Sequence, residues 1–522
     1  MLPDKFASAQ RKHNFVAQCN EDCLPPLIQN ALYGVQSLSH SPWINHAVNM
    51  LIIGNVNKDP YVRSLMLIFK TLDDVLWVWW FDRQGAIQSE GVNMVQNLPY
   101  VLLLILVMQR FTLEDWGINT KMFFEVKNVY YSDLDDRGQI PPQIQRHFKT
   151  STQNKDFYFY PGSDQIIHHY YSLTGRGTSV YRCIQVDGCG EQTEVALKTS
   201  WSEVTRDTED RIIAKAKELA GTDPDVEHHL PDVLGAVHFD AYNTRSIRDI
   251  LDVDWGGRPE TNGRSLLFLL LGLLRPLLSS PPEDVLRIWF EVVKCTSFFI
   301  TFFFTHLHIY STAGHYTLWN AGVEHTDPSL DNVMVTLDGR YGVLADWDLG
   351  VIRNNPKRGT TERMGTFPFM AVDLLTPEYW EGDLRRLYRH DLEGFVWILP
   401  WIALRYDNGV EKDQPRLVEW ASGDYDMCRL YKYGFLHEPN RRAREDKHVA
   451  SCYLPLWKLA CILLQRISFE ELVRQGSIPE TSEEPSVAVL KTRMWWVDRR
   501  SSMESSGNGL NRRLCSLEEI QF

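Results

Sequence analysis

Two acidic segments, each next to a short apolar stretch, constrain this chain more than any other feature of its sequence. The first, residues 325–332, reads HTDPSLDN and is followed directly by the apolar residues 333–335. The second, residues 346–348, reads DWD and follows the largely apolar residues 342–345. Apolar runs bounded by turn residues predict a polar loop, two short strands and a second polar turn. An acidic turn between two strands would explain either segment by itself.

The polar side chains of these segments suit the chemistry of a metal-bound phosphate. Asp327 and Asn332 stand five residues apart in the first segment, and Asp346 begins the second. One carboxylate can orient a hydroxyl nucleophile, while an amide oxygen and a second carboxylate can bind Mg²⁺ that bridges phosphates. A simple turn does not explain why both segments follow a glycine loop and a strand lysine in this order.

That glycine loop and lysine lie upstream. Residues 175–180 read GRGTSV, with Gly175 and Gly177 between extended apolar stretches. Glycine allows a tight turn and a close approach of backbone N–H groups to a phosphate, although a plain hairpin explains the pattern equally well. Residues 195–198 read VALK, a predicted strand whose Lys198 can reach the α- and β-phosphates of a nucleotide. An ordinary exposed strand lysine would be the simpler explanation of that residue alone.

A helix carboxylate would be needed to hold such a lysine in place. Glu209 begins a stretch, residues 209–213, in which apolar residues follow at helical spacing. Glu218, further along the same predicted helix, is the alternative partner of Lys198. Most glutamates on such helices are solvated, so the sequence leaves both choices open.

The order of the glycine loop, VALK, HTDPSLDN and DWD resembles that of a eukaryotic-type protein kinase, with its H-R-D-x-x-x-x-N and D-F-G motifs. Further segments resemble the fungal-type protein kinase family, which typically reads D-F-D, then G-T-x-x-F-M-A and H-D-L-E-S-F. They are GVEHTD (322–327), GVLADWDL (342–349), MGTFPFMA (364–371) and RHDLEGF (389–395). The N-terminal stretches LWVWWFDRQGAI (76–87) and LEDWG (113–117) also resemble that family.

The resemblance implies an α+β fold of the bilobal protein-kinase type. A β-rich N-lobe would extend to about residue 274, and a helical C-lobe would follow a hinge near residues 272–276. A smaller α/β N-terminal region would precede this domain, and its first 45 or so residues show no assignable pattern. The expected divisions are the N-terminal region (1–125), a linker (126–165), the kinase-like domain (166–475) and a polar C-terminal tail (476–522).

Within these regions, alternation and apolar runs predict particular elements. Residues 65–69 and 75–80 predict strands, and residues 99–110 predict a buried helix. Residues 266–271 would form the strand that enters the hinge, which explains their apolar character without a membrane.

The resemblance also implies roles for individual residues. The catalytic residues would be Asp327, Lys198 and Asn332. The Mg²⁺ ligands would be Asn332 and Asp346. The ATP-binding residues would be Gly175, Gly177, Val180, Lys198 and Glu209. The supporting residues would be His325, Thr366, which would contact Asp327 from the substrate side, and Asp391, a buried residue that would brace the catalytic loop.

Three positions depart from the usual kinase pattern. Thr326 stands where most protein kinases carry an Arg that pairs with a phosphorylated activation loop, and Thr cannot form such a charge-assisted contact. Ser329 replaces the lysine of Ser/Thr kinases, as is usual for the family, and Asp373 stands where A-P-E would place Glu.

An ATP-dependent phosphotransferase that acts on Ser and Thr residues of proteins agrees best with these features. The alternative is a pseudokinase that keeps the fold without turnover, which Thr326 and the unusual N-terminus favour. A small-molecule kinase shares H-x-D-x-x-x-x-N, but the GTFPFMA segment, a peptide-docking element in protein kinases, argues against it.

Composition narrows the partners and the compartment. A formal charge of −13 argues against a dedicated nucleic-acid binder, whose surface is usually basic. Nine cysteines without C-x-x-C spacing indicate reduced thiols inside the cell, and the first residues lack the pattern of a signal peptide. The apolar runs at 100–108, 266–278 and 297–307 are too short to span a membrane. We therefore expect a protein substrate, ATP and Mg²⁺, with no nucleic acid or membrane partner.

Overall fold

The computed structural model describes the chain in several stretches that fall into two compact units. One unit comprises residues 1–206 and 233–272, and the other comprises residues 207–232 and 273–522. The described residues are 26–40, 44, 46–53, 75–118, 147–149, 156–159, 166–186, 192–221, 224–252, 263–294, 318–319, 321–353, 365–474 and 476. The predicted strand at 65–69 and the aromatic run at 297–307 lie outside these stretches.

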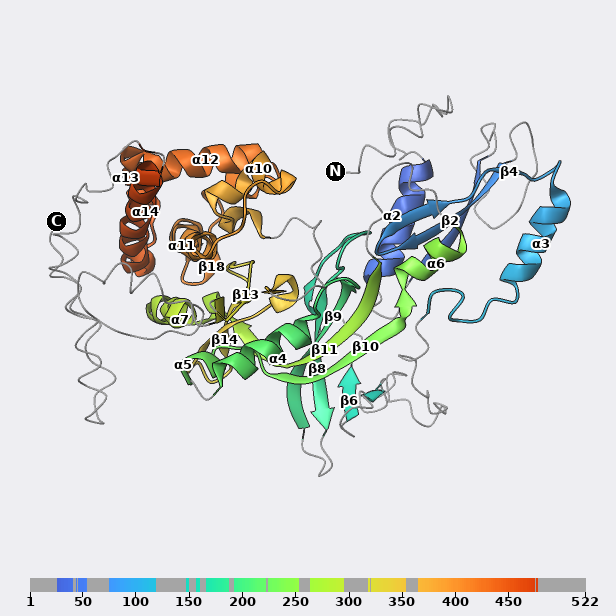
Figure 1. Ribbon diagram of the computed structural model, residues 1–522, viewed down its shortest axis with the longest axis horizontal. Helices are drawn as coiled ribbons and strands as arrows, with labels where there is room; N and C mark the ends of the chain where they lie inside the picture. Colours follow the sequence, from blue (N-terminus) through green and yellow to red (C-terminus); the bar gives the residue numbers. More distant parts are fainter. Residues whose placement is uncertain are drawn as a thin grey trace. The chain divides into compact units, whose positions relative to one another are not determined.

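The first unit begins with a small antiparallel sheet and a helix packed on it. The sheet has the order β1-β2-β3, and β4 pairs with β2. Helix α2 lies along this sheet in Figure 1, and its Ala31 and Leu38 pack with Trp79 and Phe81 of β2 in one apolar cluster. The prediction of a strand at 75–80 is confirmed. The bounds are α2 (Pro26–His40), β1 (Ala47–Ile53), β2 (Val75–Asp82), β3 (Gly85–Gln88) and β4 (Val92–Asn93).

Helix α3 (Leu98–Met108) confirms one part of its prediction and contradicts another. The helix forms, with a proline in its first turn, where the missing N–H is tolerated. Its burial was predicted wrongly: Val101 and Met108 are buried, whereas Leu102 is 56% exposed. A helix that is apolar on every side can bury only the face that meets the neighbouring small sheet, where Val101 packs against Leu76.

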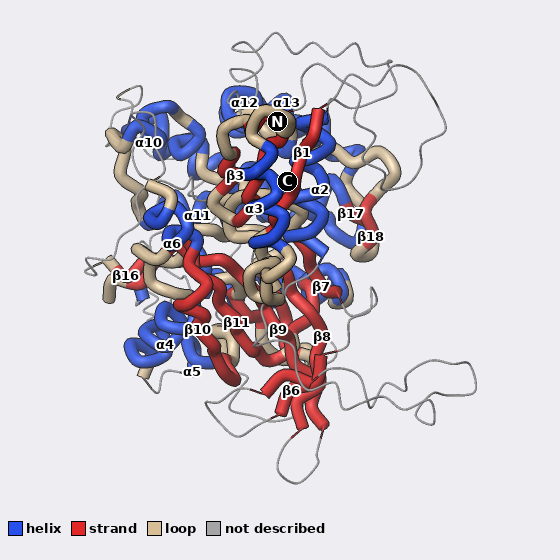
Figure 2. Tube along the Cα trace, turned by 90° about the vertical axis from the view of Figure 1, so that its right-hand side faces the viewer, coloured by secondary structure: helices blue, strands red, loops and turns tan. Residues whose placement is uncertain are grey.

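A larger antiparallel sheet forms the rest of the first unit. Its strand order is β10-β11-β9-β8-β6-β5, and β7 pairs with β8 beside β6. Figure 2 shows the long strands β10, β11, β9 and β8 side by side. Helix α6 (Thr244–Ile250) follows β10 directly. The strand bounds are β5 (His147–Lys149), β6 (Asp156–Phe159), β7 (Ile166–His169), β8 (Ser179–Val186), β9 (Gln192–Glu203), β10 (Val233–Asn243) and β11 (Arg264–Gly272).

The core of this sheet explains the apolar sequence of its central strands. Strand β11 confirms the predicted strand at residues 266–271, and its pairing with β10 on one side and β9 on the other makes it a central strand of the sheet. Strands β5 and β6 fall within residues 126–165, where the sequence predicted a linker. The buried cluster consists of Tyr181, Cys183, Val195, Leu197, Trp201, Phe239, Leu266, Phe268 and Leu270.

Helices dominate the second unit. Helix α11 is buried from His390 to Leu404, and it packs against α14. A helix that is apolar all round, as most of α11 is, needs a position inside a core, which α11 has in this unit. The principal helices are α4 (Glu209–Ala220), α5 (Pro224–Glu227), α7 (Pro282–Lys294), α10 (Pro377–Glu381), α11 (Tyr388–Arg405), α12 (Tyr425–His437), α13 (Pro439–Glu445) and α14 (Leu454–Arg474).

Short strand pairs flank the two acidic segments in this unit. Strand β14 pairs with β15 and with β12, and β13 pairs with β16. The predicted pair of strands between the acidic segments is therefore present. Their bounds are β12 (Leu274–Pro276), β13 (Val323–Glu324), β14 (Val333–Thr336), β15 (Gly342–Leu344) and β16 (Val351–Ile352).

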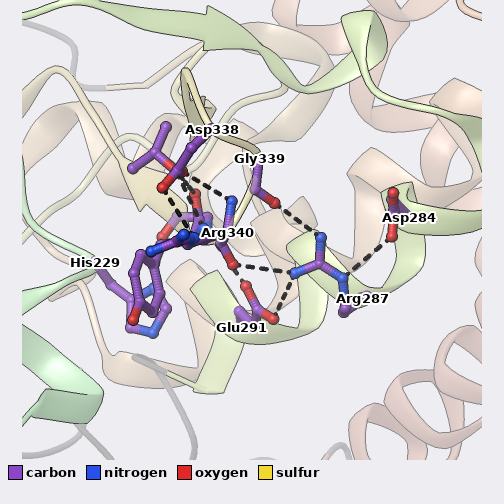
Figure 3. A network of polar contacts seen from close by, with 10 residues as sticks. His229, Asp284, Arg287, Glu291, Asp338, Gly339 and Arg340 are labelled. Carbon is purple, nitrogen blue, oxygen red and sulfur yellow. Dashed lines mark hydrogen bonds and ion pairs between the residues drawn. The ribbon is translucent and has the colours of Figure 1, made fainter. Parts of the chain in front are cut away.

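Polar contacts fix the β14–β15 hairpin to helix α7, as Figure 3 shows. Arg287 of α7 donates to the carbonyl oxygen of Gly339 at 3.1 Å, in the hairpin turn. Glu291, one helical turn further on, accepts from the backbone N–H of Gly342 at 3.2 Å and pairs with Arg287 at 2.7 Å. The hairpin joins the two acidic segments, so α7 holds both in place.

Among the helices in the described stretches, none is long and apolar enough to cross a membrane.

Candidate active site

The carboxylate of Asp327 is held from one side by Thr366. Oδ1 of Asp327 accepts hydrogen bonds from the backbone N–H of Thr366 at 2.8 Å and from its hydroxyl at 2.9 Å. The side-chain amide of Asn332 donates to the carbonyl oxygen of Asp327 at 2.8 Å, which closes the loop between the two residues. The two bonds from Thr366 use Oδ1, and the Asn332 amide nitrogen also lies 3.5 Å from Oδ2, so the orientation of the whole carboxylate is fixed.

His325 supports the same loop from within the core. Its side chain is fully buried, and Nε2 lies 2.9 Å from the carbonyl oxygen of Ala345. Nδ1 accepts from the backbone N–H of Asp327 at 3.3 Å, so the proton belongs on Nε2. Burial lowers the pKa of His325, which favours this neutral form. The imidazole also contacts the Trp347 ring edge to face, with 4.7 Å between the ring centroids.

Thr326 has a left-handed backbone conformation that a buried carboxylate stabilises. Its φ is 68°, which is unfavourable for a β-branched residue. The backbone N–H of Thr326 donates to Oδ2 of Asp391 at 3.2 Å, and its hydroxyl donates to the carbonyl oxygen of Leu349 at 2.8 Å. Arg386 donates to Oδ1 of Asp391 at 2.8 Å through Nε and at 2.6 Å through Nη2. Asp391 thus joins the HTDPSLDN loop to a buried arginine, which the sequence did not reveal.

The two residues predicted to bind Mg²⁺ lie on either side of the β14–β15 hairpin. The backbone N–H of Ala345 donates to the carbonyl oxygen of Asn332 at 2.8 Å, so the residue before Asp346 contacts Asn332 directly. The backbone of Asp346 has a left-handed conformation, with φ 58° and ψ 68°. Because the Asn332 amide nitrogen already donates to Asp327, its amide oxygen is the atom suited to a cation.

This donor set fits Mg²⁺, which prefers oxygen ligands and usually takes only one or two from the protein. Asn332 would offer an amide oxygen and Asp346 a carboxylate. No group of three or more His, Cys, Asp or Glu side chains is arranged as a metal site in the described part of the chain. A cation held here would therefore depend on further oxygens from a bound nucleotide or from water.

The two glutamates that the sequence offered as partners of Lys198 have different surroundings within the second unit. Glu209 is 1% exposed, and its Oε1 accepts from the backbone N–H of Trp347 at 3.1 Å. The side chain of Glu218 is 67% exposed and pairs with Lys215 at 2.8 Å on the helix surface. Glu209 is therefore the glutamate whose carboxylate is directed at the DWD segment.

Lys198 and the glycine loop belong to the first unit. Lys198 lies on the central strand β9, opposite Val180 of β8 and Leu269 of β11, and its side chain is buried. It lies on the face of β9 opposite that of Leu197, since neighbouring strand residues alternate. Gly175 and Gly177, just before β8, have φ of +91° and +51°, which explains the preference for glycine there.

Buried polar groups fix the backbone of the segment after Thr366. Lys432 of α12 donates to the carbonyl oxygens of Pro368 and Met370 and lies 4.4 Å from the ring centroid of Trp397. Glu393 of α11 accepts from the backbone N–H of Val372 at 2.8 Å. Neither role was predicted from the sequence, because a lone lysine or glutamate on a helix normally indicates a solvated position.

The titration of Lys432 should be visible in protein stability. Burial lowers the pKa of Lys432 to about 8 from its ordinary value of 10.5. The unfolded chain therefore binds this proton more tightly, and the group's contribution to stability rises with pH between about 8 and about 10.5. We expect the free energy of unfolding of the wild type to increase relative to that of Lys432→Met between pH 8 and pH 10, measured by urea denaturation. Parallel pH profiles of the two proteins would contradict this, and the other titrating groups largely cancel in the comparison.

The fold and the site define a class: an α+β protein with the ordered residue set of a protein kinase. A family model described as fungal protein kinase matches residues 54–254 and 310–403, more than half of the chain. The chain therefore belongs to the fungal protein kinase family, and the resemblance seen in the sequence is confirmed. All site residues that the sequence predicted lie inside the matched segments, whereas Lys432 lies outside them. No curated protein matches the chain significantly.

Proposed function

We propose that this protein transfers the γ-phosphate of Mg·ATP to Ser or Thr residues of proteins. The observation that carries the proposal is the way in which Asp327 is held. Thr366 donates two hydrogen bonds to its Oδ1, and the side-chain amide of Asn332 donates to its carbonyl oxygen. Together with membership of a protein kinase family, this supports phosphoryl transfer by an oriented carboxylate.

In the proposed reaction, Oδ2 of Asp327 accepts a hydrogen bond from the substrate hydroxyl and orients it. The hydroxyl oxygen forms a bond to the γ-phosphorus, the bond from that phosphorus to the β–γ bridging oxygen breaks, and ADP leaves. The hydroxyl proton passes to Asp327 or to the transferred phosphate. Mg²⁺, when bound by Asn332 and Asp346, would neutralise charge on the phosphates.

We propose that the two compact units are the two lobes of a kinase. The first would supply Lys198 and the glycine loop to the nucleotide, and the second would supply the catalytic loop and the metal ligands. Glu209 supports the assignment of the second unit, because its buried carboxylate accepts from the backbone N–H of Trp347 in the DWD segment.

A protein substrate is proposed over a small molecule because of the segment after the catalytic loop. Thr366 contacts Asp327 directly, and Lys432 and Glu393 hold the following backbone carbonyl and N–H groups. A rigid segment beside the catalytic carboxylate suits the docking of an extended peptide.

The second candidate is a pseudokinase, and Thr326 is the observation that favours it. Thr326 lacks the charge by which an arginine would connect the loop to a phosphorylated activation segment. In the structure, however, the backbone N–H of Thr326 donates to Asp391 and its hydroxyl donates to the carbonyl oxygen of Leu349.

The test that separates the two candidates is transfer of labelled γ-phosphate from Mg·ATP to broad panels of Ser- and Thr-containing peptides and proteins. Binding of Mg·ATP without any transfer would favour the pseudokinase.

The proposed metal ligand Asp346 offers a separate test of nucleotide binding. We expect Asp346→Asn to weaken Mg·ATP binding by at least about tenfold, because an amide does not replace a carboxylate on a hard divalent cation. The melting temperature should stay nearly unchanged. Isothermal titration with and without Mg²⁺ would measure this, with Asp338→Asn, an exposed carboxylate in the β14–β15 turn, as the matched control. Equal affinity in wild type and Asp346→Asn would remove Asp346 from the metal site.

A further inference from the structure

A buried arginine from the N-terminal sheet contacts the glycine loop directly. Arg83 lies in the turn between β2 and β3 and is buried. Its carbonyl oxygen accepts from the backbone N–H of Gly175 at 3.0 Å. A Cβ atom added to Gly177 would lie 2.4 Å from Cζ of Arg83, so the guanidinium lies against the bare Cα of that glycine. This contact gives a second reason for glycine at position 177, besides its positive φ.

The guanidinium of Arg83 also connects the loop to helix α2. Nη1 donates to the carbonyl oxygen of Ser172 in the loop, and Nη2 donates to the carbonyl oxygen of Leu38 at the end of α2, at 2.7 Å. Burial lowers the pKa of Arg83 to about 10, so the group is still charged near neutral pH. One side chain therefore fixes the loop at Ser172 and at Gly177.

The turn that carries Arg83 is itself fixed to the large sheet of the same unit. Both carboxylate oxygens of the buried Asp82 pair with Arg248 of α6, at 2.6 and 2.9 Å. Next to it, Gln84 accepts from the hydroxyl of Thr244 at 2.9 Å. The DRQG turn is thus held between α6 and the glycine loop, and it cannot move without breaking a buried ion pair.

The opposite side of the loop is attached to the strand that carries Lys198. The backbone N–H of Trp201, three residues after Lys198 on β9, donates to the carbonyl oxygen of Arg176 at 2.8 Å. The loop is therefore held between β9 and the DRQG turn. Its N–H groups can bind a phosphate well only if this position is maintained.

We propose that Arg83 is a positioning residue for the nucleotide phosphates, and that the N-terminal sheet is part of the nucleotide site through it. This inference rests on the proposed function. Arg83 would act on the phosphates through the glycine loop and would leave recognition of the adenosine part unaffected.

The test compares ATP with adenosine, because only ATP carries the phosphates. In the full chain, Arg83→Leu should lower the affinity for Mg·ATP by about tenfold, the loss expected when one or two hydrogen bonds no longer hold the loop. The affinity for adenosine should stay within about twofold, so the ratio of the two affinities falls. A purely structural role would lower thermal stability but would leave this ratio unchanged, when it is measured well below the melting temperature.

Two further variants make the test specific. Arg182→Leu removes a half-exposed arginine of β8 that pairs with Glu194 at 3.5 Å, and it should leave both affinities unchanged. Arg83→Lys keeps the charge and most of the volume, but one ammonium group cannot replace a planar fork that binds two carbonyls. The ratio of Mg·ATP affinity to adenosine affinity in Arg83→Lys should lie between those of the wild type and Arg83→Leu. Arg83→Lys replaces Arg83→Leu in the test if the latter does not fold.

If the wild type binds Mg·ATP more tightly than adenosine and the Arg83 variants keep the same ratio of affinities, the inference about Arg83 is wrong. The proposed function would then still stand. A wild type that binds neither nucleotide nor nucleoside would overturn the proposed function, and the inference with it. Hydrogen exchange of residues 170–178 without ligand gives a second readout, and we expect faster exchange in Arg83→Leu than in Arg182→Leu.

Discussion

Asp327→Asn is expected to lose at least ~10²-fold in phosphoryl transfer while keeping its affinity for Mg·ATP and its melting temperature. Thr366 donates two hydrogen bonds to Oδ1, and an asparagine oxygen can accept both. The loop should keep its structure, since the 2.8 Å bond from Asn332 to the Asp327 carbonyl oxygen also remains and only the 3.5 Å contact from Asn332 to Oδ2 is lost. The other atom becomes an amide nitrogen, which donates and cannot orient a substrate hydroxyl by accepting its proton.

The measurement is the initial rate of transfer to a generic Ser/Thr substrate, together with titration calorimetry and a thermal melt. Asp331→Asn is the matched control, since Asp331 lies in the same loop but its side chain is exposed. We expect the control to keep its activity within about twofold, as surface substitutions usually do. If Asp327→Asn transfers phosphate as fast as the wild type, Asp327 has only a turn-forming role.

Asp391→Ala is expected to have the largest effect on stability, about 3–5 kcal/mol. The substitution would leave Arg386 buried without its partner and would remove the acceptor of the Thr326 N–H. It would also remove the contact that stabilises the left-handed conformation of Thr326. The free energy of unfolding from urea denaturation would measure this loss.

Two comparisons separate the ion pair from general effects of substitution. Asp391→Asn keeps an acceptor for Thr326 but loses the charge, so its loss should be smaller than that of Asp391→Ala. Glu218→Ala removes an exposed partner of Lys215, and we expect it to cost less than about 0.5 kcal/mol. A cost for Asp391→Ala as small as that of Glu218→Ala would show that Asp391 does not hold the catalytic loop.

The sequence predicted the parts of the site in which several motifs occur in a fixed order. The segments around Asp327, Asn332 and Asp346 identified a loop, a strand pair and a turn, and the structure places them so. Residues 266–271 formed a central strand because their apolar run fits a strand with neighbours on both sides. Periodicity and turn residues act locally, so these features can be read from the chain.

The sequence did not reveal partners that come from distant positions. Arg386 and Lys432 carry no local signal, since a single cation on a helix or loop is usually solvated and only the packing of α11 and α12 buries them. The same limit explains the wrong prediction for α3. An apolar run predicts burial, but burial depends on whether another element covers each face, and the run itself does not contain that information.

The buried pair of Asp82 and Arg248 makes two distant parts of this chain depend on each other. The two residues are 166 positions apart in the chain, yet each neutralises the other in a site from which water is excluded. Loss of the N-terminal hairpin would leave the charged Arg248 of α6 without its carboxylate partner. A shortened chain without the hairpin would therefore need a compensating substitution at position 248, because an unpaired buried charge is strongly destabilising.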